Sequence, residues 1–213
     1  MVPARPSLVM MALLGSAASG CAAELPTEAS ARGEVLFKNC VQCHGDSGEG
    51  STLMNAPAIA GLPQWYVEAQ VTHFQTGWRG AHADDVEGLK MRPMSRTLKS
   101  AADVSLVSAH VSKLAVNRGE ASLVGDVAKG QSAYATCSVC HGADGTGNEA
   151  MKAPPLRQLN DWYIVAQLRK FKTGVRAYEP ADASGATMKA QAGAVPDEAA
   201  MRDLAAYIHT LPL

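Results

Sequence analysis

Two stretches of the sequence share one pattern: Cys40-Val41-Gln42-Cys43-His44 and Cys137-Ser138-Val139-Cys140-His141. The second lies 97 residues after the first, and the same offset recurs along the chain without a gap. Self-similarity at one fixed period is typical of a tandem duplication, so we predict two copies of one small domain. The offset also pairs Gly33 with Gly130, Phe37 with Tyr134, Pro57 with Pro154, Trp65 with Trp162, Tyr66 with Tyr163, Gln70 with Gln167, Phe74 with Phe171, Arg79 with Arg176, and Met91 with Met188.

The duplication divides the chain. We expect an N-terminal domain over residues 31–117, a polar linker over residues 118–123 and a C-terminal domain over residues 124–213. Of the 213 residues, 47% are hydrophobic and 18% are charged, which is typical of a globular protein. The 19 Lys and Arg residues against 20 Asp and Glu residues leave no basic excess, so nucleic-acid binding is not expected. Aromatic residues make up only 5%, so another large apolar body is expected to fill the two cores.

Both copies are predicted to be all-α, because apolar residues recur at helical spacing and no alternating strand pattern is present. Asn160 or Asp161 is expected to cap the middle helix of the second copy. The segments that contain Met91 and Met188 are predicted to be loops that precede the last helix of each copy. The expected helices are residues 33–40, 63–76 and 101–114 in the first copy, and residues 126–137, 159–173 and 197–211 in the second.

The N-terminus has the pattern of an export signal over residues 1–21, with Arg5 ahead of a short apolar stretch. Its end, Ala18-Ser19-Gly20-Cys21, resembles a bacterial lipobox, in which the Cys21 thiol is acylated. Residues 22–30 would then form a tether. We therefore expect a periplasmic protein that is lipid-anchored to a membrane; the alternative is cleavage after Ala23 with no lipid.

The Cys-x-x-Cys-His pattern is typical of covalent haem c attachment. Two thiols three residues apart lie on one helical turn and reach the two vinyl groups of a porphyrin, and the adjacent histidine then reaches the iron. We predict two haem c groups, held by Cys40 and Cys43 with His44, and by Cys137 and Cys140 with His141. A zinc site shared between the motifs and a redox dithiol are weaker alternatives. The two porphyrins would also be the large apolar bodies expected to fill the cores, which contain few aromatic side chains.

Methionines are the best candidates for the sixth iron ligand, because two methionine pairs recur at the 97-residue offset. A thioether ligand raises the reduction potential of haem iron. Met91 and Met188 are equivalent in the repeat and lie far enough from their histidines to reach the opposite face of the haem. Met94 is the local rival of Met91. Met54 and Met151 lie too close to their histidines and are expected to pack at the haem edge. Bis-histidine ligation would use one of the unduplicated histidines: His73, His82, His110 or His209.

Two further repeated pairs are candidates for the haem environment. The backbone carbonyl of Pro57 or Pro154 could accept the second N–H of the iron-bound imidazole and so orient the ring. Arg79 and Arg176 could pair with haem propionates, although solvated arginines are an equal alternative.

The two motifs, the Gly-rich segments after them, the Trp-Tyr helices and the paired methionines together resemble a di-haem class I cytochrome c of the cytochrome c4 family. The resemblance covers residues 30–213. It implies two small all-α domains, each wrapped round a covalently attached haem with His/Met iron, in a protein that carries electrons in the periplasm.

We therefore expect an electron carrier and not an enzyme, since iron with both axial positions filled has no site for substrate. Its donor and acceptor would be of the classes quinol-cytochrome c reductase and haem-copper oxidase. The alternatives are a cytochrome subunit of a periplasmic dehydrogenase, a small di-haem peroxidase and a haem-based sensor, of which the last two need an open iron.

Overall fold

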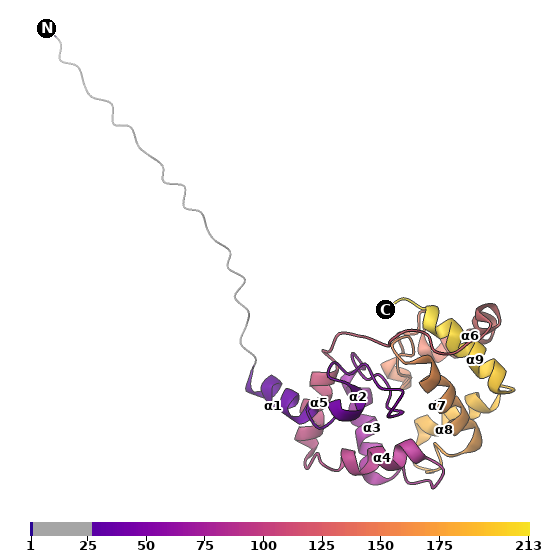
Figure 1. The fold of residues 1–213 in the computed structure, drawn as a ribbon, viewed down its shortest axis with the longest axis horizontal. Helices are drawn as coiled ribbons and strands as arrows, with labels where there is room; N and C mark the ends of the chain where they lie inside the picture. The colour runs from indigo at the N-terminus through magenta and orange to yellow at the C-terminus, as the bar shows by residue number, and fades with distance from the viewer. Residues whose placement is uncertain (2–26) are drawn as a thin grey trace.

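The fold consists of two helical halves that lie side by side (Figure 1), seen in a computed structural model that describes Met1 and residues 27–213. The predicted signal segment, Cys21 and residues 22–26 of the predicted tether lie outside the described residues. The first half contains α1 (Glu28–Phe37), α2 (Val41–His44), α3 (Gln64–Thr76), α4 (Val86–Ser95) and α5 (Ala101–Val111). The second contains α6 (Val127–His141), the 3-10 helix η1 (Glu149–Met151), α7 (Asp161–Thr173), α8 (Ala183–Gly193) and α9 (Glu198–Thr210).

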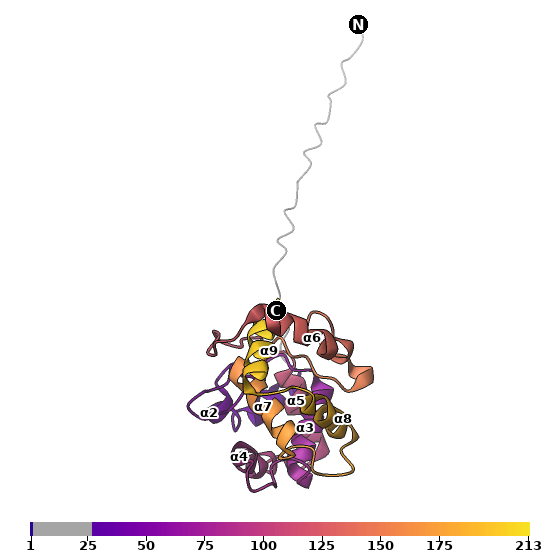
Figure 2. The ribbon, with the colours of Figure 1, turned by 90° about the vertical axis from the view of Figure 1, so that its right-hand side faces the viewer.

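The described residues form no sheet, which agrees with the all-α prediction. Their two isolated bridges, Ser51 with Ala56 and Asn148 with Ala153, obey the 97-residue offset of the sequence. Both views place α3 of the first half and α7 of the second near the centre of the molecule (Figure 2). Among residues 27–213, no helix combines the length and the apolar character that crossing a membrane requires.

The first helix of each copy differs from its predicted range. In the first copy it begins at Glu28, where the Thr27 hydroxyl accepts from the Ser30 N–H at 3.2 Å, and it ends at Phe37 before the cysteines. Residues 28–30 of the predicted tether are therefore helical. In the second copy, α6 continues through the cysteine motif to His141. The break falls at Lys38 and Asn39, which Ala135 and Thr136 replace in the second copy; Asn favours turns and Ala favours helix.

The prediction of loops around Met91 and Met188 is wrong, because both residues lie on helices, α4 and α8. Each helix is started by a buried aspartate. Asp85 accepts a hydrogen bond from the Gly88 N–H at 3.1 Å, and Asp182 accepts one from the Gly185 N–H at 2.8 Å. An aspartate that accepts from the N3 amide is a strong N-terminal helix signal, which outweighs Pro93 inside α4.

Close helix crossings join the first and last helices of each half, and a glycine allows each one. A Cβ atom at Gly33 would lie 2.5 Å from the Leu106 carbonyl oxygen, and one at Gly130 would lie 1.9 Å from the Asp203 carbonyl oxygen. No real Cβ atom approaches a backbone oxygen so closely, so any larger residue would push the two helices apart.

We therefore expect Gly130→Ala to lower the free energy of unfolding by about 1–3 kcal/mol through overpacking. Chemical denaturation of the holoprotein followed by circular dichroism measures the change. Gly193→Ala is the matched control, since a Cβ there meets nothing within 4 Å and Ala favours the helix. Equal losses in both variants would contradict this account of the crossing.

The predicted linker, residues 118–123, packs on the C-terminal half instead of spanning free solvent. Its Ser122 N–H, Ser122 hydroxyl and Leu123 N–H all donate to the buried Asp161 carboxylate, at 2.6, 2.7 and 2.7 Å. The Arg118 guanidinium donates to the carbonyls of Arg157, His209 and Leu211. Both ends of the linker are thus bound to the C-terminal half.

Asn160 is the N-cap residue of α7 by position, but its side chain makes no capping hydrogen bond. It connects three segments instead. Its Oδ1 accepts from the Ala58 N–H of the first half at 2.6 Å, and its Nδ2 donates to the Arg118 carbonyl of the linker at 2.7 Å. Of the two predicted caps, Asn160 or Asp161, Asn160 holds the N-cap position, but its side chain joins the halves instead of capping the helix.

Asp161 makes stability depend on pH. Burial by itself would raise the pKa of Asp161, but the hydrogen bonds from Ser122, Leu123 and the Trp162 N–H outweigh it and hold that pKa below its ordinary value. The resulting stabilisation is complete above the unfolded pKa of about 4 and is lost as the pH falls through the lower folded value.

We expect Asp161→Asn to cost about 1–3 kcal/mol of unfolding free energy at pH 7. The difference from the parent protein should shrink below about pH 4. Urea denaturation across this range tests the prediction, with exposed Glu34→Gln as the control. A constant difference between pH 7 and pH 3 would exclude the carboxylate as the cause.

Candidate haem-binding sites

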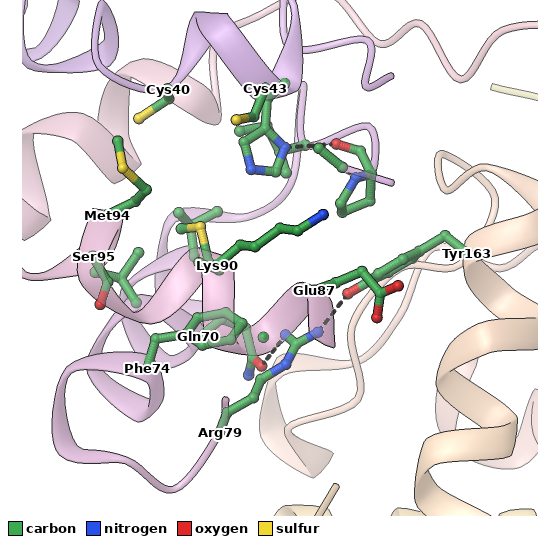
Figure 3. Close-up of a pocket in the computed structure, with 18 of the residues that line it drawn as sticks. Cys40, Cys43, Gln70, Phe74, Arg79, Glu87, Lys90, Met94, Ser95 and Tyr163 are labelled. Carbon is green, nitrogen blue, oxygen red and sulfur yellow. Dashed lines mark hydrogen bonds between the residues drawn. The ribbon is translucent and has the colours of Figure 1, made fainter. Parts of the chain in front are cut away.

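A cavity in the first half brings together the residues that the first motif predicts. Cys40, Cys43 and His44 line it, and Met91 on α4 lines it as well. Figure 3 shows the thiols of Cys40 and Cys43 above the cavity, with Lys90 and Met94 on the helix below. Residues that are far apart in the sequence, at the start and the middle of this half, thus surround one space.

The two motif histidines have the same orientation in both halves. The His44 Nδ1 lies 2.8 Å from the Pro57 carbonyl oxygen, and the His141 Nδ1 lies 2.7 Å from the Pro154 carbonyl oxygen. The structure therefore contains both of the expected contacts to proline carbonyls. With Nδ1 protonated and donating, Nε2 keeps its lone pair and is the nitrogen able to bind a metal.

Burial sets the protonation of these groups. Both rings are less than one-tenth exposed, and burial lowers the pKa of His44 and His141, although the hydrogen bond to each proline carbonyl opposes it. Burial also raises the pKa of the Cys40 thiol to about 11, with a smaller contribution from Cys43. The rings are therefore neutral, and among the described residues all four cysteines are free of disulfides.

The cavity contains three thioethers: Met54, Met91 and Met94. Met91 is half-buried, whereas Met54 and Met94 are 41% and 40% exposed. In the second half, Met188 is half-buried and packs, with Cys137, against the buried apolar cluster. Met91 and Met188 thus occupy equivalent and more sheltered positions than their rivals.

The four unduplicated histidines lie outside the lining of this cavity. His82 is directed to the neighbouring backbone, where its Nδ1 accepts from the Asp84 N–H at 3.2 Å. The ring of His110 lies tilted against Phe37, and His73 lies tilted against Trp78. Bis-histidine ligation at the first site would therefore require these side chains to move.

Arg79 and Arg176 are half-buried and form a network between the two halves. Each donates to the glutamine of its own half, Gln70 or Gln167, at 2.9 Å. Each also donates across the interface to the other glutamine, at 3.1 and 2.8 Å. Each contact that Arg79 makes to the two glutamines is repeated by Arg176 with the roles of the two halves reversed. The two halves are therefore related by an approximate twofold axis.

The symmetry is incomplete. Arg79 also donates to the Tyr163 hydroxyl at 2.8 Å, a contact that Figure 3 marks with a dashed line. The sequence signal for this network was available, because Gln70, Gln167 and Tyr163 all belong to the repeat. Their role was missed since a repeat identifies equivalent positions without revealing which of them face the partner domain.

The C-terminal half completes the wall of the first cavity through α7. The wall is mostly apolar, with polar groups at one side, which suits a flat apolar ring that carries a polar edge. Two thiols on one turn, a neutral imidazole and a thioether on another helix are the donor set that a covalent haem requires. The residues present therefore fit the group. The contributing α7 residues are Leu159, Trp162, Tyr163, Ala166, Gln167 and Lys170.

An all-α unit built twice, with a Cys-x-x-Cys-His motif in each copy, defines the class of tandem covalent haem proteins. The cytochrome c family model matches residues 30–115 and again residues 127–212. The chain therefore belongs to the cytochrome c family. Its two domains imply two covalently bound haem c groups, and it is a di-haem class I cytochrome of the cytochrome c4 type.

Related sequences include cytochrome c-552 of Acidithiobacillus ferridurans, 29% identical over 99% of this chain and 90% of that protein. A thiosulfate dehydrogenase electron acceptor of Thiomonas intermedia is 32% identical over 67% of this chain, which spans 66% of that protein. A cbb3-type cytochrome c oxidase subunit, CcoP of Azospirillum, is 27% identical; the match covers 86% of this chain and 62% of the subunit.

Among solved structures, cytochrome c4 of Pseudomonas stutzeri superposes with a TM-score of 0.68 at 24% identity, over 86% of this chain and 98% of that one. The thiosulfate dehydrogenase TsdBA of Marichromatium purpuratum gives 0.71 at 32% identity, over 86% of this chain but only 40% of its own. The agreement with cytochrome c4 over nearly its full length supports the two-domain architecture.

Proposed function

We propose that this protein carries single electrons in the periplasm through two His/Met haems, one in each domain, residues 31–117 and 124–213. The observation that carries the proposal is the shared cavity of Cys40, Cys43, His44 and Met91. A chain that supplies both axial ligands leaves the iron no position for a substrate, which favours electron transfer over catalysis.

The bound haem supplies an iron that accepts and releases one electron. Cys40 and Cys43 would hold the first haem covalently, with His44 and Met91 as its axial ligands. Pro57 fixes the His44 ring by accepting its Nδ1–H at 2.8 Å, so that Nε2 stays directed at the metal position. The same offset identifies the corresponding residues of the second site: Cys137, Cys140, His141, Met188 and Pro154.

Arg79 and Arg176 would bind haem propionates near the domain interface. Arg79 lines the first cavity. Both guanidinium groups lie over phenylalanine rings, with 4.6 Å from the Arg79 Cζ to the centre of the Phe74 ring and 4.3 Å from the Arg176 Cζ to the centre of the Phe171 ring. A fixed guanidinium at the rim of an apolar pocket suits a carboxylate.

The partners we propose follow from the names of the relatives. Similarity to an oxidase subunit supports an acceptor of the haem-copper oxidase class. The donor proposed for this role, a quinol-cytochrome c reductase, is the class expected from the sequence and not from a relative's name. The thiosulfate dehydrogenase electron acceptor supports a second candidate, in which a periplasmic dehydrogenase supplies the electrons. A lipid at Cys21 would keep the carrier close to membrane partners and raise its effective concentration there.

Visible spectra of the mature holoprotein, oxidised and reduced, with and without carbon monoxide, test the proposal. We expect a weak far-red sulfur–iron band in the oxidised protein and no change when carbon monoxide is added to the reduced protein. A change in the absorption of part of the haem on adding carbon monoxide would mean that one iron has an open position. The function would then be that of a peroxidase or a sensor and not that of an electron carrier.

A further inference from the structure

The approximate twofold symmetry of the interface fails at one pair of positions. Lys170 on α7 is the repeat equivalent of His73 on α3. The Lys170 ammonium donates across the interface to the Asp85 carboxylate at 2.5 Å and to the Glu87 carboxylate at 2.6 Å. All three residues line the cavity of the first site. A charged group of the C-terminal domain thus forms part of the N-terminal haem site.

This ion pair is well sheltered from water. Asp85 is 2% exposed and the Lys170 side chain 15%, while Glu87 is 40% exposed. Burial by itself would raise the pKa of Asp85, but Lys170 and Arg79 outweigh it and keep that pKa below its ordinary value. Removing one partner of such a pair leaves the other charge buried and uncompensated, which is strongly destabilising.

The pair lies at the start of the helix that carries Met91. Asp85 is the N-cap of α4 and accepts from the Gly88 N–H, so one carboxylate both starts the helix and binds Lys170. Glu87 lies in the first turn of the same helix. Movement of Lys170 would therefore loosen the first turn of α4, and Met91 follows within the next turn and a half.

The second site has no equivalent ion pair among the described residues. Asp182, the N-cap of α8, accepts from the Ser184 hydroxyl and the Gly185 N–H of its own segment. Ser184 replaces Glu87, and His73 replaces Lys170. Burial, together with Arg176 and Arg79, holds the pKa of His73 below its ordinary value although Asp182 opposes this, so the ring is neutral at pH 7.

We propose that Lys170 is a cross-domain positioning residue for the N-terminal haem: by holding Asp85 and Glu87 it fixes α4, and with it the sixth ligand Met91. The inference rests on the His/Met ligation proposed above and goes beyond it. It makes the two haem sites of the duplicated chain unequal, because only the first depends on a charge of the other domain to hold its methionine.

Imidazole titration of the oxidised holoprotein tests this, since imidazole displaces a methionine that leaves the iron. A Met188→His background keeps a far-red sulfur–iron band from the first site alone, and a Met91→His background keeps one from the second. In the first background we expect Lys170→Met to lower the half-displacing imidazole concentration about tenfold, equivalent to about 1.4 kcal/mol. In the second background the concentration should not change.

Controls separate positioning from general destabilisation. Lys129→Met removes the same charge from a site that is 75% exposed and should change neither titration. Lys170→Arg should restore most of the loss, because a guanidinium can serve both carboxylates. If Lys170→Met does not fold, Glu87→Gln is the milder variant and should shift the first site in the same direction.

The reverse change completes the design. His73→Lys combined with Ser184→Glu builds the missing pair at the second site, and in the Met91→His background it should raise the half-displacing concentration.

An equal shift in both backgrounds, or none in the first, would overturn the positioning role while leaving the carrier intact. Absence of the far-red band from the Met188→His protein before any imidazole is added would instead overturn the ligand assignment and the inference with it.

Discussion

Met91→Ala is expected to remove about half of the far-red sulfur–iron absorption of the oxidised protein and to open about half of the haem to carbon monoxide when reduced. The reason is that Met91 is the half-buried thioether of the first cavity, and its loss leaves the iron without a sixth ligand from the chain. The midpoint potential of that haem should fall, because a thioether favours the reduced iron. Spectroelectrochemical titration measures both changes.

Met94→Ala is the matched control, since it removes a second thioether of the same helix and the same cavity wall. It should leave the band and the potential close to those of the parent protein. Met188→Ala should repeat the Met91→Ala result on the other half of the haem. If Met94→Ala lost the far-red sulfur–iron band and Met91→Ala kept it, Met94 and not Met91 would be the sixth ligand of the first haem.

Removing the attachment cysteines one domain at a time is expected to halve the bound haem, with unequal effects on stability. Among the described residues, the first half has a buried apolar cluster of six residues, whereas the second half contributes thirteen residues to a cluster that also includes Leu62 of the first half. The first domain therefore depends more on its porphyrin as core material. We expect Cys40→Ala with Cys43→Ala to unfold the N-terminal domain and Cys137→Ala with Cys140→Ala to leave the C-terminal domain partly folded.

Haem content per protein and protease resistance of each half measure the two effects. Both double variants should retain about one haem, since each removes one of the two attachment sites. Retention of both haems after either double change would contradict covalent attachment through these residues. Equal protease resistance of the two halves would mean that cluster size does not determine how far each domain depends on its haem.

Much of the architecture was predictable from local sequence. The exact 97-residue offset indicated two domains, and the apolar spacing of residues 63–76 and 159–173 predicted the helices found as α3 and α7. The Cys-x-x-Cys-His spacing predicted covalently attached haem c, because two thiols on a single helical turn can reach the two vinyl groups of one porphyrin. Proline carbonyls were predicted beside the motif histidines, and Pro57 and Pro154 lie there at hydrogen-bond distance.

Two features were mispredicted, for different reasons. The helices α4 and α8 were expected to be loops because glycines and Pro93 reduce helix propensity, whereas the buried caps Asp85 and Asp182 decide the outcome. Asn160 or Asp161 was expected to cap α7; Asn160 is the N-cap by position, whereas its side chain joins Ala58 to Arg118. The bonds of Asp85 and Asp182 reach only three residues ahead, so that helix signal was local and was overlooked. The Asn160 contacts join residues 102 and 42 positions apart and form only when the chain is packed.

The sequence by itself determined the duplication, the helical class and the haem chemistry, because each follows from covalent spacing or from the period of one helix. Only the tertiary structure decided how the domains meet: Arg79 and Arg176 in a shared network, and Lys170 on Asp85 and Glu87 of the other domain. Such contacts join residues more than 80 positions apart. They depend on how two helical surfaces pack, which no local pattern encodes.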